Sequence, residues 1–94
     1  MELLYLIFDA SDDGQGLGCW EAMASVPSGE QDAVVAEARR VLAAAERQAP
    51  GPRGPQEEGG VWDAELQVQP DGAWVAVTLT LTGPWDWGEA LLGR

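Results

Sequence analysis

Two neighbouring segments of alternating apolar and polar residues constrain the fold of this chain more than any other feature. They lie within residues 61–82, on either side of a Pro-Asp-Gly sequence at residues 70–72. A repeat of two places the apolar side chains of a strand on one face, and Pro-Asp-Gly is typical of a tight turn. The pattern predicts a β-hairpin with one apolar face, which needs a second layer to cover it. The alternating apolar residues are Trp62, Ala64, Leu66, Val68, Val75, Val77, Leu79 and Leu81.

A helix that could form this second layer is predicted for residues 30–48. Nearly every residue there favours the helix, and apolar residues recur three and four positions apart. Ser28 followed by Gln31 matches a capping box, which predicts a side-chain cap at the helix start. The proline- and glycine-rich residues 50–55 end the helix. The predicted buried stripe comprises Val34, Ala38, Val41, Leu42, Ala45 and Ala49.

Two strands are predicted before the helix. Residues 2–9 are an apolar run typical of a strand buried on both faces, so we expect it in the middle of the sheet. A loop at residues 10–18 follows, and alternation over residues 19–26 predicts the second strand, although the alanines and the methionine there also suit a helix. The expected fold for residues 1–94 is one α+β domain, a ββαββ two-layer sandwich with a four-stranded antiparallel or mixed sheet and one helix on one face.

Charge narrows the range of functions. The chain has 16 aspartates and glutamates, five lysines and arginines and no histidine, for a formal net charge of −11. Without histidine, Ser/His and Cys/His nucleophile pairs and imidazole zinc ligands are excluded, and we expect neither an enzyme nor a cofactor. An acidic surface repels nucleic acids and anionic membranes. The apolar run at residues 3–8 is too short to cross a membrane and lacks a basic leader, so the expected location is cytoplasmic.

Five tryptophans are candidates for core packing or for contact with a partner. Trp20 and Trp62 have the strand parity of the apolar face and are expected in the core. Trp74 falls on the opposite face, where either the tail of the chain or another molecule covers it. Trp85 and Trp87 lie in that tail, which is expected to fold back over the sheet or, alternatively, to contact a ligand.

The acidic residues 9–14 match the opening of an EF-hand calcium loop, with oxygen-bearing side chains and a glycine at the sixth position. The cation ligands would be Asp9, Asp12 and Asp13. The match fails at the twelfth position, where Trp20 stands in place of the required glutamate. An acidic hairpin loop without a cation is the alternative interpretation.

Asp63 and Glu65 share the outer face of one predicted strand, and glycoside hydrolysis uses a pair of carboxylates. A solvated strand face explains the same pair without a reaction. A hydrolase also needs a deep cleft, which two layers built from 94 residues rarely provide.

Residues 8–13, 20–24 and 58–67 resemble stretches of small, uncharacterised bacterial proteins of similar architecture, over less than half of the chain. The resemblance implies a bacterial source and no particular activity. The preferred hypothesis is a non-enzymatic protein-interaction module with a basic partner, such as an immunity-type inhibitor of a basic toxin or a nucleic-acid mimic. A divalent-cation site is the second hypothesis, a carboxylate-based hydrolase is the third, and a homodimer is compatible with all three. The expected contact residues of the module are Trp74, Trp85, Trp87, Asp63 and Glu65.

Overall fold

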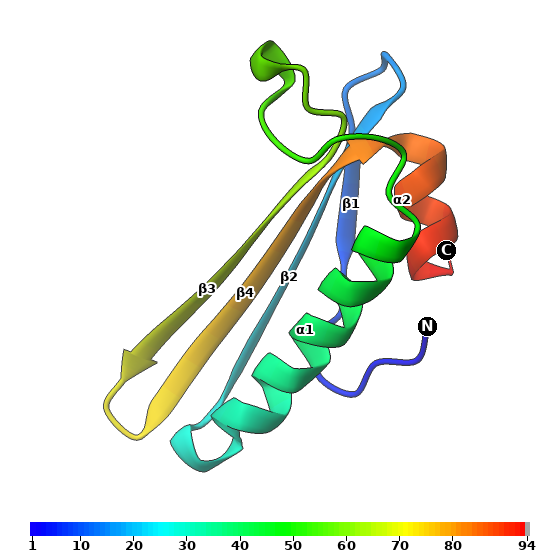
Figure 1. Ribbon diagram of the computed structural model, residues 1–94. Coiled ribbons are helices and arrows are strands. Elements are labelled where there is room, and N and C mark those ends of the chain that lie inside the picture. Colours follow the sequence, from blue (N-terminus) through cyan, green and yellow to red (C-terminus); the bar gives the residue numbers. More distant parts are fainter. Residues whose placement is uncertain (94) are drawn as a thin grey trace.

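The computed structural model describes residues 1–93, which form two layers of secondary structure (Figure 1). The elements are β1 (Asp9–Asp12), β2 (Leu17–Pro27), α1 (Gln31–Arg47), β3 (Asp63–Asp71), β4 (Trp74–Pro84) and α2 (Trp85–Leu92), with 3₁₀ turns at Ser28–Glu30 and Gln56–Glu58. The four strands form one sheet in the order β1-β2-β4-β3, and all neighbours are antiparallel. One face of this sheet is covered by α1. The predicted α+β class and the ββαββ order are confirmed, with α2 added at the C-terminal end.

The predicted hairpin is present. β3 and β4 pair from Asp63 opposite Thr82 to Asp71 opposite Trp74. The turn lies later than predicted, because Pro70 and Asp71 still belong to β3 and only residues 72–73 form the turn. Gly72 there has the positive φ of 62° that a tight hairpin turn needs. The inward residues of β4 are at most 1% exposed and are Val75, Val77, Leu79 and Leu81.

α1 begins after the 3₁₀ turn and packs its apolar stripe on β2 and β4. The predicted capping box is wrong, because no side chain caps this helix. The Ser28 hydroxyl instead donates to the carbonyl of Gly72 at 3.4 Å, and the Ser28 N–H donates to the carbonyl of Ala73 at 2.8 Å. Ser28 therefore ties the start of the helix to the β3–β4 turn. The buried residues of α1 are Val34, Glu37, Ala38, Val41, Ala44 and Ala45, whereas the predicted Leu42 is half-buried and Ala49 is exposed.

The prediction of a central strand at residues 2–9 is wrong. Strand structure begins only at Asp9, and β1 lies at the edge of the sheet, paired with β2 alone. The preceding segment buries Leu6 and Phe8 in the core but leaves Leu4 and Ile7 exposed. A strand in the middle of a sheet would have buried all four. The apolar run is thus an irregular segment that packs against the core on one side.

Glu37 of α1 explains why this segment is not a strand. Its carboxylate is 2% exposed and accepts hydrogen bonds from the backbone N–H groups of Leu4, Tyr5 and Leu6 at 2.6, 2.9 and 2.8 Å. Burial alone would raise the pKa of Glu37, but these three donors and the nearby Arg40 outweigh it and hold the pKa below its usual value. The backbone N–H groups of these residues therefore donate to one ionised carboxylate and not to a neighbouring strand.

Four tryptophans pack together between α2 and one end of the sheet. Trp20 stacks on Trp85 with 5.5 Å between ring centroids, and Trp87 lies 6.2 Å from Trp20 and 5.4 Å from Trp62. The predictions that Trp20 and Trp62 are in the core and that the tail folds back on the sheet are confirmed. Glycine makes room for these rings, because a β-carbon at Gly88 would overlap the ring of Trp20.

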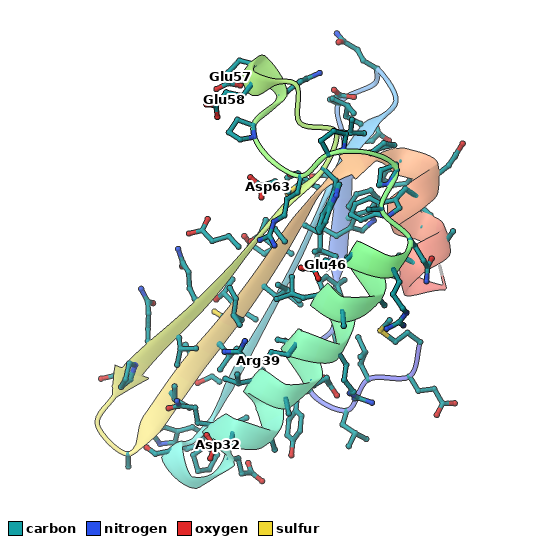
Figure 2. The ribbon with its side chains drawn as sticks, viewed as in Figure 1. Asp32, Arg39, Glu46, Glu57, Glu58 and Asp63 are labelled. Carbon is teal, nitrogen blue, oxygen red and sulfur yellow. The ribbon has the colours of Figure 1, made fainter. Side chains whose placement is uncertain are left out.

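Arg53 fixes the loop between α1 and β3. Its guanidinium lies 3.6 Å from the carboxylate of Glu46, 3.3 Å from that of Asp63, and 5.2 Å from the centre of the Trp62 ring. Figure 2 shows Glu46 on α1 and Asp63 at the start of β3, toward the same end of the molecule. The loop is thereby held beside the end of the sheet.

Candidate functional site

The face of the sheet that points away from α1 is covered by neither helix, and we call it the open face. The strand register sets its side chains in rows, because directly opposed residues point to the same side. The first row is Ser11, Cys19, Thr82 and Asp63, and the second row is Asp9, Glu21, Thr80 and Glu65. The rows bring together residues from all four strands.

The second row concentrates negative charge. Asp9, Glu21 and Glu65 are exposed, and the Thr80 hydroxyl between two of them donates to Glu21 at 3.5 Å. No strand contains a lysine or arginine that could neutralise them. Like charges directly opposed on neighbouring strands, as Asp9 and Glu21 are, destabilise a sheet. The open face therefore keeps its carboxylates at a cost in stability.

Farther along, the open face carries two large exposed apolar side chains among polar residues. Met23 is 64% exposed and Trp74 is 53% exposed, and a half-buried Ala76 lies in the row between them. Of the three tryptophans predicted as contact residues, only Trp74 has an exposed ring. Trp85 is half-buried against Trp20, and Trp87 is 9% exposed in the core.

A hollow of about 580 Å³ lies at the end of the open face. The first row forms its floor, Asp12 at the end of β1 and Asp13 in the β1–β2 turn border it, and the loop held by Arg53 contributes residues 54–56 and 60–61. Figure 1 shows this turn and this loop rising beyond the same end of the sheet. The hollow thus has hydroxyl, thiol and carboxylate groups around it, and its size is in the range of small-ligand sites.

Cys19 is the only cysteine of the chain and lines this hollow. Burial, and after it the nearby Glu21 carboxylate, raise the pKa of the Cys19 thiol. A raised pKa disfavours the thiolate, which is the nucleophilic form. Cys19 is therefore poorly suited to act as a nucleophile and serves as part of the lining.

The three carboxylates predicted as cation ligands are used differently. Asp9 points to the open face, and Asp12, three positions along the same strand, points to the opposite side. One oxygen of Asp12 accepts the N–H of Gly14 at 2.8 Å, and one oxygen of Asp13 accepts the N–H groups of Gln15 and Leu17 at 2.7 and 3.1 Å. Among the described residues, no group of three or more cysteine, aspartate and glutamate side chains is arranged to hold a metal ion.

Asp63 and Glu65 do share the open face of β3, as the alternation predicts. One oxygen of Asp63 accepts the N–H of Ala64 at 2.8 Å and faces Arg53, and Asp63 lines the hollow. Glu65 is exposed in the second row and accepts a 2.7 Å hydrogen bond from the side chain of Gln67. The two carboxylates therefore lie on an open surface and not on opposite walls of a cleft.

Glu21, Met23 and Cys19 belong to the site but were not among the residues predicted for it. All three occupy alternate positions of β2 and share its open side. The alternation was visible in the sequence. The sequence pattern does not reveal that β2 pairs with β4, and this pairing places the three residues beside the threonines of β4.

Comparison with protein families, with curated proteins and with solved structures finds no match to this chain. The bacterial source implied by the sequence resemblance stays a prediction. None of the helices within residues 1–93 has both the length and the apolar character needed to span a membrane.

Proposed function

We propose that this protein is a binding module that holds an extended basic segment of a partner protein across its open face. The observation that carries the proposal is the second row, where Asp9, Glu21 and Glu65 share one row with only Thr80 among them and no cation lies on any strand. A chain with several lysines or arginines would neutralise the row. It would also relieve the repulsion between Asp9 and Glu21.

The apolar part of the same face supports a protein as the partner. Exposed ion pairs contribute only about 0.2–1 kcal/mol each, so charge alone gives weak binding. Met23 and Trp74 add apolar area that a partner can bury, and aromatic residues are enriched at the centres of interfaces. A basic segment with apolar residues fits both parts of the face, whereas a simple cation fits only the carboxylates.

The hollow offers a place for one basic side chain of the bound segment and so sets where the segment begins. The carboxylates of Asp63 and Asp13 line it together with the hydroxyls of Ser11 and Thr82. These groups accept hydrogen bonds, and a lysine or arginine side chain supplies only donors. The partner would therefore place one basic side chain in the hollow and lay the following residues toward Met23.

The experiment is a fluorescence titration with a synthetic peptide of alternating arginine and valine, at physiological ionic strength. The double variant Glu21→Gln/Glu65→Gln should weaken binding about tenfold, because two of the three carboxylates are lost. The matched control is Glu30→Gln/Asp32→Asn, which removes the same net charge from the start of the helix layer. Figure 2 shows Asp32 at the start of α1, in the helix layer.

Cys19 supplies a second measurement, because a side chain seated in the hollow should slow its alkylation. Equal weakening by both double variants would show that only overall charge matters and would overturn the proposal. Binding of the peptide without any protection of Cys19 would exclude the hollow from the site.

A further inference from the structure

One long edge of the sheet is only partly closed. β3 is the outermost strand and pairs on one side with β4 alone. At its start the edge is covered, because the N–H of Gly54 donates to the carbonyl of Trp62 at 2.9 Å and Arg53 donates to the carbonyl of Ala64 at 3.0 Å. In Figure 1 no other element lies beside the rest of β3. The remaining part of this edge is therefore open.

Ala64 shows which backbone groups face outward. Its N–H bonds to the Asp63 side chain and its carbonyl to Arg53, so neither group points to β4. In an antiparallel pair, backbone groups face the partner strand at every second residue. The N–H and carbonyl groups of Leu66 and Val68 therefore face outward, and so does Pro70, which has no N–H. Within the described chain, no hydrogen bond joins these groups of Leu66 and Val68 to other residues.

We propose that a second copy of this chain binds here, with its β3 antiparallel to the first and the two-fold axis at Gln67. Leu66 then lies opposite Val68 of the second copy, and Val68 opposite Leu66 of the second copy. A pair of this kind exchanges two N–H···O bonds. The two symmetric pairs therefore satisfy all four open groups of each strand.

The ends of the strand favour a second copy over an unrelated strand. In this register, Pro70 of the second copy lies opposite Ala64, whose N–H and carbonyl are already bonded. Arg53 closes the edge at Ala64 and Pro70 supplies no donor, so each copy offers an open stretch of the same length, from Leu66 to Val68. A strand of different sequence would have no reason to match these positions.

The side chains agree with the same register. α1 packs on β2 and β4, and Leu66 and Val68 on the inner side of β3 remain half-buried. In the dimer, Leu66 of each copy would pack against Val68 of the other copy, and the apolar layer would continue across the interface. On the open face, Glu65 would lie opposite Gln69 of the second copy. The proposal does not depend on the binding of a basic partner.

The test is sedimentation equilibrium of the full chain from micromolar to millimolar concentration at physiological salt, where a dimer is expected. Gln69→Lys should lower the dissociation constant about threefold to tenfold, because it forms two new ion pairs with Glu65 across the symmetric interface. Gln69→Glu should raise it by a similar factor. The matched controls Ser25→Lys and Ser25→Glu make the same charge changes on β2, away from the β3 edge, and should shift the dissociation constant less than the Gln69 variants do. Equal shifts at the two positions would mean that net charge alone governs association.

Val68→Pro removes an outward N–H and leaves the bonds to β4 intact, so it should give a folded monomer. Should this variant fail to fold, the opposite effects of the two Gln69 variants still decide. A monomer at every concentration would overturn the proposal. So would Gln69 variants that shift association no more than the Ser25 variants do.

Discussion

The indole N–H of Trp20 donates a 2.9 Å hydrogen bond to the carboxylate of Glu89, which joins the buried strand β2 to α2. Trp20 is fully buried, so loss of its acceptor would leave an unpaired donor in the core. Glu89→Ala should lower the free energy of unfolding by about 1–3 kcal/mol in urea titrations. Glu89→Gln keeps an acceptor and should cost less. Equal losses in the two variants would show that the hydrogen bond is not what stabilises the contact.

Gly88 should not tolerate a side chain, because an added β-carbon would overlap the Trp20 ring. Gly88→Ala is expected to destabilise the domain by about 1–3 kcal/mol through overpacking. Gly29→Ala is the matched control, since nothing lies within 4 Å of a β-carbon at that position. Thermal melts of both variants check the prediction. A melting temperature of Gly88→Ala equal to that of Gly29→Ala would contradict it.

Glu37→Gln should weaken the attachment of the N-terminal segment. Hydrogen bonds to a charged group contribute about 1.5–3 kcal/mol, and Glu37 accepts three backbone N–H groups. The folded pKa of Glu37 is lowered, so its contribution is present above the unfolded value of about 4.3 and is lost as the pH falls through the folded pKa. The difference in free energy of unfolding between wild type and Glu37→Gln should therefore be largest near neutral pH and should disappear in strong acid. A difference that is constant with pH would contradict the ionised contact.

Leu79→Asp should unfold the domain, because Leu79 is completely buried under α1. Burial of such a side chain contributes about 1.5–3 kcal/mol, and an unpaired buried carboxylate adds a further penalty. Thr78→Asp, on the open face, should keep the fold. Thr78 is a better control than Thr80, which lies between Glu21 and Glu65 and would add a fourth carboxylate to that row. Circular dichroism separates the outcomes, and equal damage from both variants would mean that the faces are misassigned.

The hairpin and the helix could be predicted from the sequence because their signals are local. Alternation places Leu79 inward and Thr78 outward without any knowledge of distant residues, and the helical repeat does the same for Val34 and Val41. The predictions that failed depend on distant partners. The amides of Leu4 to Leu6 bond to a glutamate 31–33 positions away, and the Ser28 hydroxyl bonds to a carbonyl 44 positions away.

The candidate site was predictable only in part for the same reason. Asp63, Glu65 and Trp74 could be placed on the outer face from the alternation of their own strands. The row that joins Asp9 and Glu21 to Glu65 requires the order β1-β2-β4-β3, which no local pattern specifies. Trp85 and Trp87 were ambiguous because a tail rich in tryptophan has the same composition whether it covers a core or contacts a partner.

The contact between Glu37 and the first residues also bears on how the chain folds. Leu4, Tyr5 and Leu6 leave the ribosome before their acceptor, which follows more than thirty residues later and is oriented only once α1 has formed. Closing so long a loop carries an entropic cost that neighbouring hairpin contacts avoid. The start of this chain should therefore dock last during folding and detach first during local unfolding, with faster amide hydrogen exchange than the strands it adjoins.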